Sequence, residues 1–222
     1  MERAAHRSGR SLQEIKLIAV TKTHPASVIQ EAITIGAADF GENRVQEAEG
    51  KILSIDNGSV TWHLIGHLQA NKARRAVKLF NVIHSVDSVE LSQRLDRMCE
   101  EEQRAALSIL IQVDLAGEET KSGVAESDVN AVVQAVNEAQ HLRLSGLMVL
   151  PPFLDDPERV RPYFRRLREL RDRLKSEGHF GQEPGHLSMG MTHDFEVAIE
   201  EGATMVRIGT ALFGQRSVQS PV

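Results

Sequence analysis

The chain has 222 residues, with 26 lysines and arginines against 31 aspartates and glutamates, so its net charge is −5. This balance excludes the basic footprint of a nucleic-acid-binding domain, and no apolar run reaches the roughly 20 residues of a membrane-spanning helix. One cysteine, Cys99, rules out an intramolecular disulfide, and the polar segment Met1 to Arg10 lacks the apolar core of a secretory signal. We therefore expect a cytoplasmic protein with no membrane or nucleic-acid partner.

Short apolar runs alternate with helix-periodic segments along the chain. In the first helical segment, Pro25 suits the first turn and Gly36 suits the position that ends the helix. Asp87-Ser88-Val89-Glu90 resembles a capping box at a later helix start. A long charged helix is predicted over about 158–176. The eight predicted strands are 17–20, 38–40, 60–65, 82–86, 108–113, 142–150, 186–189 and 204–208.

Each of the first seven predicted strands is followed by a helical pattern, which favours parallel strand–helix–strand units. Such units either close into a barrel or spread into an open doubly wound sheet. A dinucleotide-binding open sheet carries G-x-G-x-x-G after its first strand, whereas here that strand runs into Thr21-Lys22-Thr23-His24. We predict a single (β/α)₈ (TIM) barrel, one α/β domain over residues 1–222, a length ordinary for this fold.

Lys22 follows the first predicted strand, and barrels carry their functional groups at the carboxyl ends of strands. One interpretation is a solvated surface lysine. Another is a lysine desolvated by packed apolar neighbours, which favours the neutral amine and makes it a nucleophile toward carbonyl groups.

Hydroxyl groups and glycines follow predicted strands seven and eight. In this fold the loops after those strands commonly bind phosphate. Glycines let backbone N–H groups approach an anion, and hydroxyl groups add donors. The candidate phosphate-binding residues are Ser188, Gly190, Thr192, Gly209 and Thr210. The alternative is that Gly190 and Gly209 only form tight turns.

Arg207 lies within an apolar strand, between Val206 and Ile208. A buried arginine needs partners. It forms either an ion pair with a neighbouring strand or a contact with a cofactor ring nitrogen. His63, His67 and His84 lie on or near strands three and four, but without the carboxylate and spacing of a metal centre, so no metal is expected.

Several motifs together resemble the pyridoxal 5′-phosphate (PLP) homeostasis protein family. The resemblance runs from about Lys16 to Arg216, with all motifs in the family's order. They are Thr21–Thr23, Phe40–Glu47, Trp62–Lys72, Lys121–Gly123, Gly146–Met148, Leu187–Met191 and Val206–Gly214.

This resemblance implies a fold similar to the barrel domain of alanine racemase and a Schiff base between PLP and Lys22. It implies that Arg207 faces the pyridine nitrogen, that Asn43 lies near the cofactor, and that the candidate phosphate-binding residues hold the phosphate. The segment before Lys16 is short for the family, so we assign no helix to it.

An arginine only donates hydrogen bonds. If Arg207 faces the ring nitrogen, that nitrogen stays unprotonated, which weakens PLP as an electron sink. The only tyrosine, Tyr163, is predicted on the outer helix after strand six, where it does not reach the ring. We therefore expect a protein that holds PLP and contributes to intracellular vitamin B6 and amino-acid homeostasis, without strong catalysis.

Two alternatives remain open. One is a slow PLP-dependent amino-acid racemase or lyase that uses water or His63 as its second proton carrier. The other is a regulatory module that contacts PLP-dependent apoenzymes or a regulatory protein through its arginine-rich outer helix, which otherwise is a solvated face. A monomer is expected, and Lys72 and Lys121 are the lysines to consider if Lys22 is not the Schiff-base residue.

Overall fold

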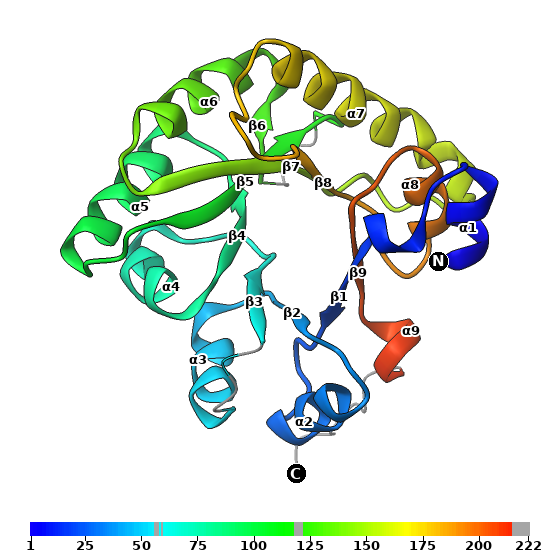
Figure 1. The fold of residues 1–222 in the computed structure, drawn as a ribbon, viewed down its shortest axis with the longest axis horizontal. Helices are drawn as coiled ribbons and strands as arrows, with labels where there is room; N and C mark the ends of the chain where they lie inside the picture. Colours follow the sequence, from blue (N-terminus) through cyan, green and yellow to red (C-terminus); the bar gives the residue numbers. More distant parts are fainter. Residues whose placement is uncertain (56–57, 59, 118–121, 215–222) are drawn as a thin grey trace.

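Eight parallel strands close into a barrel in the computed structural model, which describes residues 1–55, 58, 60–117 and 122–214 (Figure 1). The ring is complete because β9 pairs with β1 on one side and β4 pairs with β5 on the other. The strands of the ring are β1 (Lys16–Val20), β2 (Asp39–Glu42), β3 (Thr61–Leu64), β4 (Val82–Val86), β5 (Leu107–Asp114), β7 (Leu142–Val149), β8 (His186–Ser188) and β9 (Met205–Ile208). The predicted (β/α)₈ fold is confirmed, and each strand agrees with its predicted range to within two residues at either end.

One strand was not predicted. β6 (Val124–Ala125) pairs in parallel with the last residues of β5, where Val113 lies opposite Val124. It has two residues, too few to produce a recognisable pattern of apolar residues, and it lies outside the closed ring.

The helices lie outside the ring of strands (Figure 1). Gly36 ends α2 with φ +97°, and Ser88 caps α5 by accepting a hydrogen bond from the Leu91 amide at 3.1 Å. The predicted capping box is wrong in one respect, because Ser88 is the cap and Glu90 therefore stands one position too early to complete the box. The helices are α1 (Glu2–Arg7), α2 (Ala26–Thr34), α3 (Val45–Ser54), α4 (Ala73–Leu79), α5 (Val89–Glu101), α6 (Val129–Glu138), α7 (Arg161–Ser176), α8 (Phe195–Glu200) and α9 (Thr210–Phe213), with 3₁₀ turns at Leu12–Glu14, Ala70–Lys72, Glu126–Asp128 and Pro157–Val160.

A helix does form before Lys16, so its omission from the predicted elements was wrong. Ala4 and Ala5 of α1 are buried. Arg7 donates to Glu196 and Glu200 of α8 at 2.6 and 2.7 Å. Packing against α8 stabilises a helix of six residues, which is too short to persist in isolation.

The arginines of α7 contact the neighbouring helix as well as solvent. Arg161, Arg165 and Arg168 all pair with Glu201, whose side chain is 6% exposed. Arg161 also pairs with Glu158 and Glu200. The charged face of α7 is therefore partly occupied in joining it to the end of α8.

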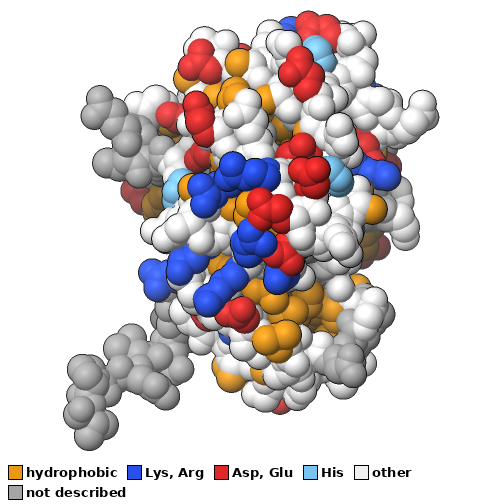
Figure 2. All heavy atoms as spheres, turned by 90° about the vertical axis from the view of Figure 1, so that its left-hand side faces the viewer, with side chains coloured by type: hydrophobic (Ala, Val, Ile, Leu, Met, Phe, Trp, Pro, Cys, Tyr) orange, Lys and Arg blue, Asp and Glu red, His pale blue; other side chains and the backbone are white. Residues whose placement is uncertain are grey.

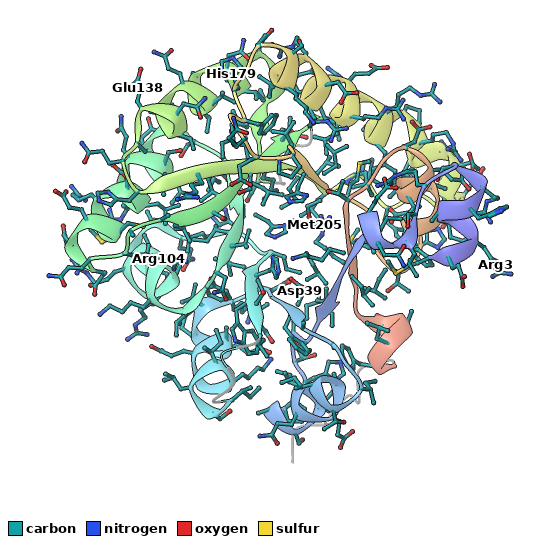
Figure 3. The ribbon with its side chains drawn as sticks, viewed as in Figure 1. Arg3, Asp39, Arg104, Glu138, His179 and Met205 are labelled. Atoms are coloured by element: carbon teal, nitrogen blue, oxygen red, sulfur yellow. The ribbon has the colours of Figure 1, made fainter. Side chains whose placement is uncertain are left out.

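The main apolar core fills the space between the barrel and its helices, and a smaller cluster of Ile18, Leu110, Met148 and Met205 lies apart from it. Side chains two residues apart on a strand share a face. Met205 and Arg207 therefore share one face of β9, while Val206 and Ile208 belong to the main core. Figure 3 shows the side chains of Asp39 and Met205 within the ring of strands.

Acidic and basic side chains are interspersed on the flank that carries α3, α4 and α5 (Figure 2). Arg74 pairs there with Glu101 and Glu102, and Lys78 pairs with Glu102. Among the helices that the structure describes, none is long and apolar enough to cross a membrane.

The packing of α5 against the barrel gives a test of stability. Leu95 is fully buried, whereas Leu53 on α3 is 74% exposed. Leu95→Ala is expected to lower the free energy of unfolding by about 2–5 kcal/mol because it leaves a cavity, and Leu53→Ala by less than about 0.5 kcal/mol. Urea unfolding of both variants measures the difference, and equal losses would contradict this packing.

Candidate functional site

A pocket of about 500 Å³ opens where the strands of the barrel end. This volume is within the range of small-molecule sites. Six of the eight predicted site residues line it, namely Lys22, Asn43, Thr192, Arg207, Gly209 and Thr210. The lining also includes apolar side chains, among them Val20, Ile65, Leu150 and Phe153, and the titratable side chains of His67, His193 and Asp194. We call this cavity the mouth pocket.

Lys22 is half-buried directly after β1, and the backbone on both sides of it is fixed. The Thr21 amide donates to the Gly41 carbonyl at 3.0 Å, and the Thr23 amide donates to the Glu47 carboxylate. Thr23 has φ +67°, in the left-handed region that few residues other than glycine adopt. Such a conformation persists only where surrounding contacts hold it, so the segment that carries Lys22 is held by its neighbours.

A second lysine, Lys51 on α3, supplies much of that support. Its Nζ donates to the Thr21 carbonyl at 2.9 Å, to Glu42 Oε1 at 2.8 Å and to Glu47 Oε1 at 2.7 Å. Glu42 is fully buried and also accepts from Thr21 Oγ1 at 2.7 Å. We call Lys51, Glu42 and Glu47 the lysine clamp, because their contacts fix the backbone before and after Lys22.

Burial and hydrogen bonding act in opposite directions on the two carboxyl groups of the clamp. Burial raises the pKa of Glu42 and outweighs the opposing effect of Lys51. For Glu47 burial also acts to raise the pKa, but the hydrogen bonds from Lys51 and the Thr23 amide, together with the charges of Lys51 and Arg44, outweigh burial and lower it. The prediction from sequence assigned no role to the clamp. The Glu47–Lys51 spacing of four residues on one helix was its only visible sign.

Arg207 is 2% exposed and binds two neutral acceptors. Its Nη1 donates to Ser188 Oγ at 2.6 Å, and its Nη2 donates to the Val149 carbonyl at 2.9 Å. Burial lowers the pKa of Arg207 to about 10, against the opposing charge of Asp194, so the guanidinium remains charged at neutral pH. Neither hydrogen-bond partner is a carboxylate. A guanidinium has five N–H donors, so Arg207 retains donors for a ligand in the mouth pocket.

Ser188 and Gly190 lie behind the pocket and do not line it. Ser188 is fully buried beside Arg207 and His84. Gly190 has φ +92°, and a Cβ on it would approach Ala198 Cβ to 2.6 Å. Its carbonyl accepts from the Arg207 amide at 2.9 Å. The glycine is required here for a tight turn that packs against α8.

Thr192, Gly209 and Thr210 lie on the pocket wall. Thr210 begins α9, and the N–H groups in a helix's first turn have no partner within the helix. In the loop between β8 and α8, Asp194 accepts from the Met191 amide at 2.6 Å, and burial raises the pKa of Asp194. The wall therefore offers hydroxyl and backbone N–H donors to an anion.

The histidines of β3 and β4 do not reach the pocket. His63 and His84 are fully buried and contact each other, whereas His67 lies on the pocket lining. The residues that the structure describes contain no group of three potential metal ligands. Lys72 lines a neighbouring hollow together with Asn43, and Lys121 lies outside the described residues.

The comparisons with known proteins agree with this architecture. A family model described as alanine racemase, N-terminal domain, matches residues 3–217. The pyridoxal phosphate homeostasis protein of Aquifex aeolicus is 44% identical over 97% of this chain and 93% of its own. That of Escherichia coli K12 is 42% identical over 96% of this chain and 91% of its own. The chain belongs to the pyridoxal phosphate homeostasis protein family.

Solved structures extend this family assignment. PipY of Synechococcus elongatus, with PLP bound, is 40% identical with a TM-score of 0.84, covering 96% of this chain and 99% of PipY. Alanine racemase of Clostridium difficile has a TM-score of 0.77 at 15% identity, covering 98% of this chain and 56% of the racemase. The latter likeness shows the barrel fold that this homeostasis family shares with the racemase domain.

The lysine clamp gives a test with a pH dependence. Because the pKa of Glu42 is raised in the folded state, its neutral form is favoured there, and stability is lost as pH rises through that pKa. Lys51→Met removes the cation that pairs with Glu42 Oε1 at 2.8 Å. The substitution is expected to lower the free energy of unfolding by about 3–5 kcal/mol near pH 8. The loss should be smaller near pH 5, where Glu42 can bind a proton.

Urea unfolding at both pH values measures this difference. Lys78→Met is the matched control, since Lys78 pairs with Glu102 at an exposed position and its loss should be small at either pH. A Lys51→Met loss that is independent of pH would contradict the role given to Glu42.

Proposed function

We propose that this chain binds PLP in the mouth pocket as a Schiff base on Lys22 and takes part in intracellular PLP and amino-acid homeostasis. Two relatives more than 40% identical are named pyridoxal phosphate homeostasis protein. PipY, 40% identical, has a solved structure with PLP bound. These likenesses support the proposal at the level of the family.

The residues around the pocket fit the three functional groups of PLP. Bound PLP supplies an aldehyde that condenses with an amine, a pyridine nitrogen that accepts a hydrogen bond, and a phosphate. Lys22 offers the amine and Arg207 the donor. Thr192, Gly209 and Thr210 offer hydroxyl and backbone donors for the phosphate. Asn43 lines the same pocket and adds a polar contact.

One observation carries the proposal: Lys22 and the buried guanidinium of Arg207 line the same pocket of about 500 Å³. An amine and a charged donor on the lining of one cavity of this size match the aldehyde and the ring nitrogen of PLP. Ser188 and Gly190 contribute from behind, by holding the side chain and the backbone of Arg207.

Arg207 also bears on what the pocket does with PLP. A guanidinium with a pKa of about 10 donates and does not accept at neutral pH. A ring nitrogen facing it stays unprotonated, which weakens the electron withdrawal that PLP enzymes use. We infer that the site holds PLP without strong catalysis.

The alternative of a racemase or lyase with His63 as the second proton carrier lacks support from the geometry. His63 is fully buried, and its ring nitrogens contact His84 and Asp39. Tyr163 lies on α7 and is not among the residues that line the pocket. Neither His63 nor Tyr163 is therefore supported as the second proton carrier in this pocket.

The homeostatic role implies partners that receive PLP, either PLP-dependent apoenzymes or a regulatory protein. We propose that the chain acts as a monomer and as one domain over residues 1–222. The arginine-rich helix α7 is the candidate contact surface from the sequence, although three of its arginines pair with Glu201 within the protein.

Substitution of Lys22 tests the proposal. Wild-type protein mixed with PLP is expected to develop the visible absorbance band of a Schiff base, and Lys22→Ala to develop none. Lys72→Ala is the matched control, because Lys72 lines only the neighbouring hollow and should leave the band unchanged. A band that persists in Lys22→Ala and disappears in Lys72→Ala would assign the Schiff base to Lys72.

The inference of weak catalysis has its own test. Wild-type protein saturated with PLP should not exchange the Cα hydrogen of common amino acids for solvent deuterium, because an unprotonated ring nitrogen facing Arg207 weakens the electron withdrawal on which removal of that hydrogen depends. Proton NMR of the amino acids in heavy water follows this exchange. Exchange that is lost in Lys22→Ala would support the racemase or lyase alternative.

A further inference from the structure

A continuous series of hydrogen bonds crosses the interior of the barrel from the mouth pocket toward the opposite end. Arg207 Nη1 contacts Ser188 Oγ at 2.6 Å, and Ser188 Oγ contacts His84 Nδ1 at 2.9 Å. His84 Nε2 contacts His63 Nδ1 at 2.9 Å, and His63 Nε2 contacts Asp39 Oδ1 at 2.9 Å. We call these five residues, on strands β9, β8, β4, β3 and β2, the interior chain.

The two ends of the interior chain fix the direction of every hydrogen bond in it. Arg207 can only donate, and an ionised Asp39 can only accept. A neutral His63 must therefore carry its proton on Nε2, which leaves Nδ1 to accept. His84 must then donate from Nε2 and accept at Nδ1, so that the Ser188 hydroxyl donates to it. All donors point from the mouth toward Asp39.

The surroundings of these groups favour the charge states that this direction requires. Burial lowers the pKa of His63 and, more strongly, that of His84, so both rings are neutral at neutral pH. His84 faces His63 on β3, Arg207 on β9, His186 on β8 and Lys16 on β1. Each of those groups is a cation when it is charged, so it disfavours the protonated, positively charged form of His84.

Asp39 is held as an anion at the far end. Burial acts to raise its pKa, but hydrogen bonds from His63 and from Lys16, whose Nζ lies 3.0 Å from Asp39 Oδ1, outweigh burial and lower it. Asp39, Lys16 and His186 line a second pocket, separate from the mouth pocket. Figure 3 labels Asp39 within the ring of strands.

The interior chain is suited to orientation and not to proton transfer. Moving a proton along it would require Arg207 to release one, which its pKa of about 10 disfavours at neutral pH. A chain with a single direction, in contrast, fixes the rotamer of each member and the tautomer of each histidine.

We propose that Ser188, His84, His63 and Asp39 are positioning residues that hold the Arg207 guanidinium in one orientation, with its remaining N–H groups available to the mouth pocket. The part of this inference that concerns the cofactor rests on the proposed PLP site. The direction of the interior chain does not, because it is a property of the protein alone.

The tautomers test the direction without any PLP. Long-range ¹H–¹⁵N spectra of the protein labelled at histidine, recorded near neutral pH, should show His63 and His84 as neutral rings with the proton on Nε2. Asp39→Asn and His84→Leu provide the assignments. An Nδ1–H tautomer or an imidazolium at either residue would overturn the proposal, whether or not the protein binds PLP.

A double-mutant cycle tests the effect on the pocket. Ser188→Ala and His84→Leu should each weaken PLP binding roughly tenfold, about the effect of one misplaced charge-assisted hydrogen bond. Because both act through Arg207, the double variant should also lose about tenfold and not about a hundredfold. Titration of each variant with PLP, followed by absorbance, gives the dissociation constants.

His186→Gln is the matched control for the cycle. His186 is a partly buried histidine of the same barrel interior, but it contacts Thr204 and is outside the interior chain. It should bind PLP as the wild type does. Single variants that bind normally, or losses that multiply in the double variant, would overturn the proposal. A wild type that fails to bind PLP would instead refute the proposed function, with the tautomer result still deciding the inference.

Discussion

A permanent positive charge inside the barrel is the constraint on which the rest of the site depends. Burying a guanidinium is costly unless its donors find acceptors, and Arg207 finds them in the Ser188 hydroxyl and the Val149 carbonyl. Those acceptors come from β8 and β7, the two strands that follow β9 in the order of the sheet. The polar series from Ser188 to Asp39 then occupies interior space that apolar side chains fill in many barrels. The charge thus influences what the interior contains as well as what the pocket can bind.

Closure of the ring also brings Lys22 to the same cavity. β9 pairs with β1 so that Ile18 lies opposite Arg207, and Lys22 follows β1 shortly afterwards. The lysine clamp fixes the backbone at Thr21 and Thr23, and the interior chain fixes Arg207 from behind. The backbone that carries Lys22 and the guanidinium of Arg207, which are distant in sequence, are therefore held by separate buried networks before any ligand arrives. Preorganisation of this kind lowers the entropic cost of binding.

The eight strands of the ring could be predicted from the sequence because parallel strands buried on both faces are continuous apolar runs. β6 could not be predicted because it has only two residues. α1 could not be predicted because its stabilising contacts are with Glu196 and Glu200, far along the chain. Lys22 and Thr210 were predicted at the mouth from their positions after strands, and Arg207, within a strand, was predicted to face the cofactor ring from the family resemblance; all three line the pocket. Ser188 was predicted to bind phosphate but lies behind Arg207. The side chain's direction depends on strand register and barrel closure, which residue types do not specify. The lysine clamp was missed for a related reason, since a buried ion pair between a strand and a helix leaves almost no local pattern.

The most direct test of a PLP site framed by Lys22 and Arg207 is to find which lysine of the wild-type protein reacts. The protein is mixed with PLP, reduced with borohydride and digested, and the pyridoxyl group is located by mass spectrometry. The account predicts the label on Lys22, which lines the mouth pocket with Arg207. A label confined to other lysines, or no label with PLP in excess, would contradict it.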